Sequence, residues 1–170
     1  MKTLLVALAL AVGPQGHVPA VPANYAGNWT LDVAQSKNLP PYYSRVHSHK
    51  LAITQDDQHL NVGVDIDFGQ PQPDHLSFVY AFDGIETKTT SSIRTRDGMV
   101  SVPTTLKATV ADDGGLHITI SHEIPMPSGP VTGVTTEDWH LSPDHATLTV
   151  HRVDDGPRGR MEADMVFVKG

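Results

Sequence analysis

Apolar and polar residues alternate along most of this chain, which is the pattern of β-strands with one buried face. The first clear example runs from Leu51 to Phe68, where Asp56-Asp57 separates two alternating segments. Similar segments follow, and Asp-Gly pairs at 83–84 and 97–98 interrupt them. Glycine adopts the positive φ that tight turns require, so an Asp-Gly pair between alternating segments predicts a β-hairpin.

About nine or ten such segments follow one another to Phe167, each separated from the next by a few turn residues. Short connections between consecutive strands favour an up-and-down meander, and closure into a barrel removes exposed strand edges. We therefore predict an all-β fold, an antiparallel up-and-down β-barrel with about 8–10 strands and very little helix. The one predicted helical turn covers 32–35, where Asp32 can cap the backbone.

The first 23 residues have the pattern of a secretory signal peptide. Met1-Lys2 supplies a positive charge, Leu4 to Val12 is apolar, and Val21-Pro22-Ala23 offers small residues for signal peptidase. The apolar run is far shorter than the roughly 20 residues that span a bilayer, which argues against a retained anchor helix. We expect a periplasmic or secreted protein in which residues 24–170 form one β-barrel domain.

Composition narrows the choice of partners. The sequence contains no cysteine, so disulfides do not hold the fold and no cysteine can carry a lipid. Its 19 acidic and 12 basic residues give a formal charge of −7, and loss of Lys2 makes the mature part more negative. An acidic chain without Lys/Arg clusters is poorly suited to nucleic acid or to anionic membrane surfaces. We expect no nucleic acid and no membrane anchor.

Two segments resemble a known family. The run from Tyr25 to Asp32, with Ser36-Lys37 after it, resembles the G-x-W-x-L-[DN] opening of lipocalin-like proteins exported by many bacteria. The run from Asp138 to Asp144, followed by 147–150, resembles their penultimate hairpin, W-x-L-S-x-D-G-x-T-L-T-V. The Ser-Lys order replaces the usual Lys-Ser, and His145 stands where glycine is usual.

The resemblance implies a calycin-type barrel with a cup for an apolar or amphipathic small molecule, and it implies no enzymatic activity. It gives structural roles to Gly27 and Trp29, with the indole closing one end of the barrel. In lipocalins a late-strand arginine packs across this tryptophan in a cation–π contact. Arg152 lies on the same strand face as Leu148 and Val150, so it is the candidate partner of Trp29.

Histidines interrupt the apolar faces. His47 and His49 share one face of their strand, because strand residues two apart point the same way. A tight turn centred on Asp56-Asp57 would place them opposite Ile66 and Val64, respectively. If that face is internal, both imidazoles project into the cup.

Small-molecule sites are concave, mainly apolar and tuned by a few polar groups, and the inward faces offer that combination. The partner is expected to be a small apolar or amphipathic molecule, bound without a cofactor. The candidate ligand-binding residues are His47, His49, Val62, Val64, Phe78, Tyr80, Ile118 and His122.

Three alternatives stay open. Imidazoles ligate metals and haem iron, but His-x-His has no third ligand in an established register, so no metal site is predicted and a His-ligated haem or metal binder is an alternative. A second alternative is a cell-envelope structural or interaction protein with a packed barrel and an envelope protein as partner. The third is a calycin-like enzyme, although no hydrolase, zinc-protease or nucleotide-binding motif occurs and no catalytic residue is predicted.

Overall fold

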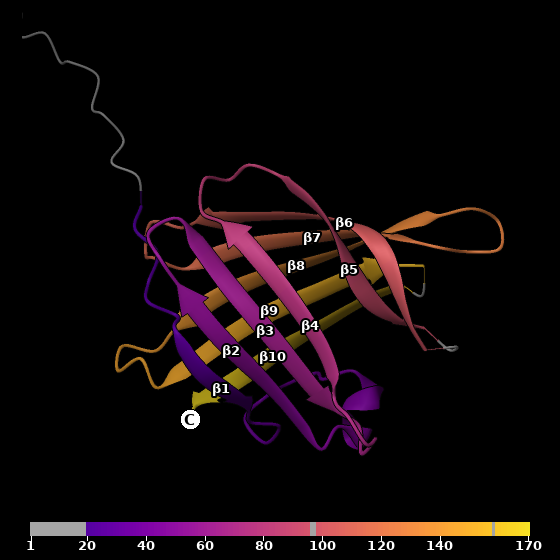
Figure 1. Cartoon of the computed structure of the whole chain (residues 1–170). Coiled ribbons are helices and arrows are strands. Elements are labelled where there is room, and N and C mark those ends of the chain that lie inside the picture. Colours follow the sequence, from indigo (N-terminus) through magenta and orange to yellow (C-terminus); the bar gives the residue numbers. More distant parts are fainter. Residues whose placement is uncertain (1–19, 96–97, 158) are drawn as a thin grey trace, which may run out of the picture.

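The computed structural model describes residues 20–95, 98–157 and 159–170. This part of the chain folds into ten β-strands and one short 3-10 helix (Figure 1). The predicted all-β fold with very little helix is confirmed. The elements are β1 (Gly27–Leu31), η1 (Pro41–Arg45), β2 (Ser48–Gln55), β3 (His59–Asp67), β4 (Asp74–Ala81), β5 (Thr87–Thr95), β6 (Gly98–Val110), β7 (Leu116–Ile124), β8 (Val131–Leu141), β9 (Thr147–Gly156) and β10 (Gly159–Lys169).

The strands form one antiparallel sheet that curves into a nearly closed barrel (Figure 1). Its order is β4-β3-β2-β1-β10-β9-β8-β7-β6-β5, which confirms the predicted up-and-down meander. β4 and β5 are the two edges of this sheet. Arg94 of β5 donates hydrogen bonds to both carboxylate oxygens of Asp74 on β4, and its guanidinium lies 5.2 Å from the centre of the Phe68 ring. These contacts tie the two edges together.

The turn between β2 and β3 is two residues wider than predicted. His49 pairs with Ile66, whereas a tight turn would have placed it opposite Val64. The carboxylate of Asp56 accepts backbone hydrogen bonds from the second and third residues after it, at 2.8 and 2.7 Å, and so stabilises the wider turn. Because the shift is two residues, every side chain keeps its predicted face of the sheet.

One end of the barrel is packed around Trp29. The indole is 1% exposed, and its N–H donates to the carbonyl of Tyr25 at 2.9 Å. The Tyr25 ring meets Trp139 edge-on at 5.8 Å, and its hydroxyl lies 3.2 and 3.1 Å from the carbonyl oxygens of Gly114 and Trp139. Other fully or nearly fully buried side chains at the core are Leu60, Leu116, Ile118, Leu148 and Phe167.

The backbone conformations of Gly27 and His145 explain why glycine is usual at these two positions in the resembling family. Gly27 has φ +144°, and a Cβ there would lie 2.7 Å from Cε of Lys169, which passes over it to reach Trp29. His145 has φ +56° in the β8–β9 turn, at the position where glycine is usual in the resembling family. Glycine adopts both conformations without a Cβ penalty, whereas histidine at such a φ is uncommon.

The structure has two short helical features, the turn that begins at Asp32 and the helix η1, and only the first was predicted from the sequence. Asp32 caps the predicted turn, because its carboxylate accepts hydrogen bonds from the backbone N–H groups of Ala34 and Gln35 at 2.9 and 3.1 Å. The helix η1 was not predicted. Pro41 at its first position is the available signal, because proline is favoured where a helix begins.

The predicted signal segment lies outside the described residues up to residue 19. The backbone N–H of Ala23 donates to the carbonyl of Gly114 at 2.9 Å, and its carbonyl accepts a hydrogen bond from the Gln55 amide at 2.9 Å. The residues just before the predicted domain boundary therefore contact the barrel. Within the described ranges, no helix is long and apolar enough to cross a membrane.

Candidate ligand-binding site

A charged side chain, Arg152, projects from β9 into the barrel. Strand alternation places it on the same face as the buried Leu148 and Val150. Nevertheless, 35% of the Arg152 side chain is accessible to water. Arg152 lines a small crevice together with Tyr42, Tyr43 and Met161, so part of its exposed surface faces this crevice. We call the inner face of the barrel around Arg152, away from the Trp29 end, the cup, and Arg152 with its bonded neighbours the floor of the cup.

Two carboxylates hold Arg152 in place. Its Nε and Nη2 donate to the two oxygens of Asp154 at 2.9 and 2.8 Å, and its Nη1 donates to Glu137 at 2.8 Å. The second oxygen of Glu137 accepts the indole N–H of Trp139 at 2.9 Å, and the hydroxyl of Thr135 donates to Asp154 at 2.6 Å. The register of β8 on β9, which places Glu137 opposite Arg152, brings these groups together.

These contacts keep the groups at the floor of the cup charged. Burial opposes the positive charge of Arg152, but Glu137 and Asp154 outweigh it and raise the pKa of the guanidinium. Burial likewise works to raise the pKa of Asp154, but its bonds to Arg152 and Thr135 outweigh that effect and lower the pKa. The floor therefore holds the Arg152 cation and the Asp154 carboxylate, and the two oxygens of Glu137 accept hydrogen bonds from Arg152 and Trp139.

Two hydroxyl groups link His122 of β7 to β5. The Thr104 hydroxyl lies 3.0 Å from Nδ1 of His122, and the Ser91 hydroxyl lies 2.7 Å from that of Thr104. Burial lowers the pKa of His122, the charge of Arg152 lowers it further, and Asp154 acts against both. His122 is therefore neutral at neutral pH, so one ring nitrogen can donate and the other can accept a hydrogen bond.

His49 is the most enclosed histidine of this region. It is 7% exposed, its Nδ1 lies 3.1 Å from the hydroxyl of Tyr43, and its ring meets Phe167 edge-on at 5.2 Å. Among the buried side-chain nitrogens and oxygens of the described residues, its Nε2 alone has no hydrogen-bond partner. Burial first, and then the charge of Arg152, lowers the pKa of His49 from 6.5 to about 4.

The pKa of His49 predicts a loss of stability in acid. The unfolded chain binds a proton at this histidine below pH 6.5, whereas the folded chain binds it only near pH 4. The free energy of unfolding should therefore fall by about 3 kcal/mol between these values, since one pKa unit corresponds to about 1.4 kcal/mol. Urea unfolding at a series of pH values measures this. His49→Gln should show a smaller slope, and an equal slope in both proteins would contradict the prediction.

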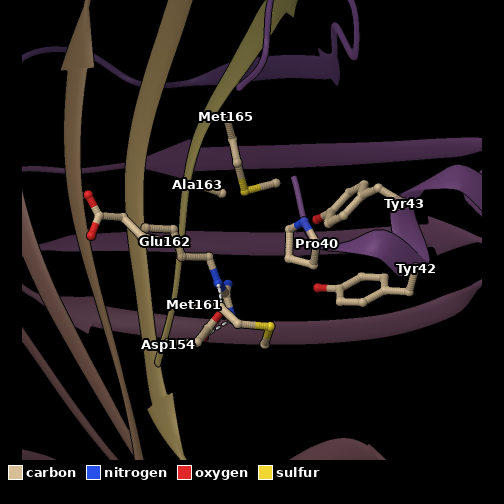
Figure 2. A pocket seen from close by; sticks show the side chains of 9 residues that line it. Pro40, Tyr42, Tyr43, Asp154, Met161, Glu162, Ala163 and Met165 are labelled. Carbon is tan, nitrogen blue, oxygen red and sulfur yellow. Dashed lines mark hydrogen bonds and ion pairs between the residues drawn. The ribbon is translucent and has the colours of Figure 1, made fainter. Parts of the chain in front are cut away.

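The helix η1 covers one side of the cup. Tyr42 and Tyr43 stack with ring centres 4.9 Å apart, and Figure 2 shows both facing Met161 and Met165 of β10, with Glu162 extending away from them. The crevice between η1 and β10 leaves a volume of about 10 Å³. That is about the space of one water molecule, and Arg152 and Asp154 also line this crevice.

Most of the predicted binding residues lie on the inner surface of the barrel, but at different depths. Val64 and Phe78 are half-buried and pack against the core, which places them on the wall of the cup. Tyr80 is buried and stacks on Phe78 at 6.0 Å, and burial followed by the charge of Glu137 raises its pKa. The remaining predicted residues are His49 and His122, described above, and Val62 and Ile118, which are buried in the packed core.

His47 lies outside the cup, contrary to the prediction that it shares the inward face of His49. It precedes the first residue of β2, Ser48, and its side chain is exposed. Its ring lies against Gly69 in the β3–β4 connection, where a Cβ would come within 2.6 Å of it. The period-two rule fails at His47 because the chain bends before the strand begins.

The predicted contact between Arg152 and Trp29 was wrong. The cation over the Trp29 ring is Lys169, whose Nζ lies 5.0 Å from the ring centre. The reason is the barrel closure, because β1 pairs with β10 and places Lys169 directly beside Trp29. Arg152 lies further along the barrel and bonds to Glu137 and Asp154 instead.

The acidic residues of this site were not predicted from the sequence. Glu137 and Asp154 alternate in step with Trp139 and Arg152 on their strands, so both occupy inward positions. Charged residues at inward positions of a strand were the available signal, because ionised groups are rarely buried without partners. Across the described part of the chain, no group of three His, Asp or Glu side chains is arranged to hold a metal ion.

Sequence comparison gives no family for this chain. No protein-family model matches it, and a search of curated proteins finds no match. The resemblance to exported bacterial lipocalin-like proteins therefore stays a prediction.

Comparison with solved structures finds chains of low sequence identity that cover most of this one. One is described as a REP1-NXSQ fatty acid transporter, with 12% identity over 85% of this chain and 95% of that chain, and a TM-score of 0.47. Another is a zebrafish ileal bile acid-binding protein in complex with cholic acid, with 11% identity over 86% and 98% of the two chains, and a TM-score of 0.48.

Proposed function

We propose that this chain is an exported binding protein that holds a small apolar or amphipathic molecule in the cup. The ligand would lie between the apolar wall at Val64 and Phe78 and the polar floor at Arg152. The crevice beside η1 is too small for it, so it would enter from the open mouth of the barrel. Export rests on the signal-type pattern of the first 23 residues.

The position of Arg152 carries this proposal. A buried ion pair is a weak source of stability, and well-packed apolar residues of similar volume often replace one without loss. A barrel that served only as a solid scaffold would gain little from an Arg–Glu–Asp cluster on its inner face. Partly accessible polar groups beside apolar walls are instead the arrangement of small-molecule sites.

A second candidate is a cell-envelope interaction protein that uses the barrel rim. Met99, Met126 and Met161 are about 40% exposed. Met99 and Met161 lie near the starts of β6 and β10, and Met126 lies between β7 and β8. Exposed methionines suit adaptable contacts with another surface. Absence of binding for every apolar probe, in a folded protein, would favour this candidate over a carrier.

Filling the cup should abolish binding without affecting the outside of the barrel. In a titration with Nile red, an uncharged apolar dye, Val64→Trp should weaken binding by at least about tenfold, which corresponds to ~1.4 kcal/mol. The matched control is Val79→Trp on β4, because Val79 is 48% exposed on the outer surface. Circular dichroism and thermal melting establish that both variants fold.

Equal weakening by both variants, or none by either, would contradict a site in the cup. Native mass spectrometry of the full-length chain expressed in a bacterium tests the same proposal independently. It should show a protein that has lost its signal segment and that releases a small molecule on activation. A full-length mass would contradict processing by signal peptidase.

A further inference from the structure

The wall of the barrel contains one boundary that backbone hydrogen bonds do not close. β4 and β5 lie at the two ends of the strand order, and within the described residues no backbone ladder joins them. Every other pair of neighbouring strands is joined by such a ladder. We call the boundary between β4 and β5 the seam. Backbone groups along an unpaired strand edge depend on water or side chains for partners, so the seam lacks the contacts that hold the rest of the wall.

Water reaches the inward side of β5 along the seam. Thr87 and Thr89 of β5 pair with residues of β6 that are each 2% exposed, so their side chains point to the inner face of the barrel. Thr87 and Thr89 are nevertheless exposed. Two residues further along, Ser91 is buried and its hydroxyl bonds to that of Thr104 on β6. The first half of β5 is therefore open to water on its inward side.

One cluster of side chains crosses the seam. Arg94, near the end of β5, donates to both carboxylate oxygens of Asp74, the first residue of β4. Its guanidinium also lies over the ring of Phe68, which follows β3. The Asp74 side chain is 12% exposed, so water screens this charge-assisted pair less than it screens a fully exposed one. Among the described residues, no other side-chain hydrogen bond or ion pair joins β4 to β5. We call Arg94, Asp74 and Phe68 the latch.

We propose that the barrel opens at the seam and that the latch controls this opening. Elsewhere in the wall, two strands separate only when a whole ladder of backbone hydrogen bonds breaks. The seam separates when one arginine leaves one carboxylate, so its opening is a local event that needs less free energy than global unfolding. The open state gives water and small solutes lateral access to inner residues beside the seam, such as Phe78 of β4 and Ser91 of β5.

Hydrogen exchange followed by mass spectrometry on the whole protein at neutral pH tests the proposal. Arg94→Gln removes the charge and the paired hydrogen bonds but keeps a polar side chain at this position. Amide exchange in 74–81 and 87–95 should become at least about tenfold faster, because hydrogen bonds to charged groups contribute enough to shift an opening equilibrium by that factor. Exchange in β8 and β9 should stay the same. Equal acceleration in all strands would show that Arg94 supports only global stability, and no acceleration would show that the seam stays closed without the latch. Either result would overturn the proposal.

Arg160→Gln is the matched control. Arg160 pairs with Glu162 on its own strand and therefore crosses no boundary between strands. This variant should leave exchange in β4 and β5 unchanged. An equal acceleration there would reveal a general effect of losing one positive charge and would contradict the latch.

Changing the other partner assigns the effect to the contact itself. Asp74→Asn should accelerate exchange in the same two segments, and combining it with Arg94→Gln should add little, because both changes break one contact. Additive effects would mean that the two residues stabilise their strands separately, which would overturn the latch. If Arg94→Gln fails to fold, Arg94→Lys decides the question, because lysine keeps the charge but loses the paired geometry. It should give a smaller acceleration confined to 74–81 and 87–95, and a uniform or absent acceleration would overturn the proposal.

Discussion

Replacement of Trp29 by alanine is expected to lower the free energy of unfolding by about 3–5 kcal/mol, the usual range for a buried aromatic side chain. The indole is 1% exposed and fills the closed end of the barrel, and its N–H bonds to the carbonyl of Tyr25. Its loss leaves a cavity and an unpaired carbonyl, and it removes the ring beneath Lys169. The melting temperature should drop by roughly 10 °C, as measured by differential scanning calorimetry.

A surface substitution provides the comparison for Trp29. Val79 is 48% exposed on the outer face of β4, so Val79→Ala should change the free energy of unfolding by no more than about 0.5 kcal/mol. An unchanged melting temperature in Trp29→Ala would show that the closed end does not depend on the indole.

Replacement of Arg152 by leucine is expected to cost about 3 kcal/mol at neutral pH. Removing one partner of a buried ion pair costs about 3–5 kcal/mol, and the lower end applies because a third of this side chain remains in contact with water. Glu137 and Asp154 would be left close together without their cation. Chemical denaturation of the variant and the unmodified protein measures the difference.

The effect of Arg152→Leu should depend on pH with a definite sign. Arg152 lowers the pKa of Asp154 in the folded chain, so this contact stabilises the fold above the ordinary pKa of 3.8. The stabilisation is lost as the pH falls through the lowered pKa. The difference between the two proteins should therefore be largest at neutral pH and should shrink below about pH 4.

A triple variant separates the charge effect from lost packing. Arg152→Leu combined with Glu137→Gln and Asp154→Asn removes the orphaned carboxylates while leaving the leucine in place. It should recover most of the stability, because replacing a whole buried charge cluster is far less costly than breaking it. A triple variant as unstable as Arg152→Leu alone would show that packing of the arginine stem, and not its charge, is what matters.

Much of the inner surface could be predicted from local pattern. Alternation identified Val64, Phe78 and Tyr80 as inward-facing, and the wider β2–β3 turn changed their partners across the sheet but not their side. The rule failed at His47, because it holds only within a strand and β2 begins one residue later. Glu137 and Asp154 were not predicted as part of the site, although strand alternation places both on the inward face that contains Arg152.

The sequence by itself determined the strand alternation, the meander of short turns and the inward positions, because these depend on neighbours along the chain and on a side-chain period of two. Only the tertiary structure decided which cation covers Trp29, since the pairing of β1 with β10 joins residues 140 positions apart, Trp29 and Lys169. It also decided that Arg152 bonds to carboxylates from its own strand and from β8. Such contacts depend on strand register and barrel closure, and local periodicity carries no information about either.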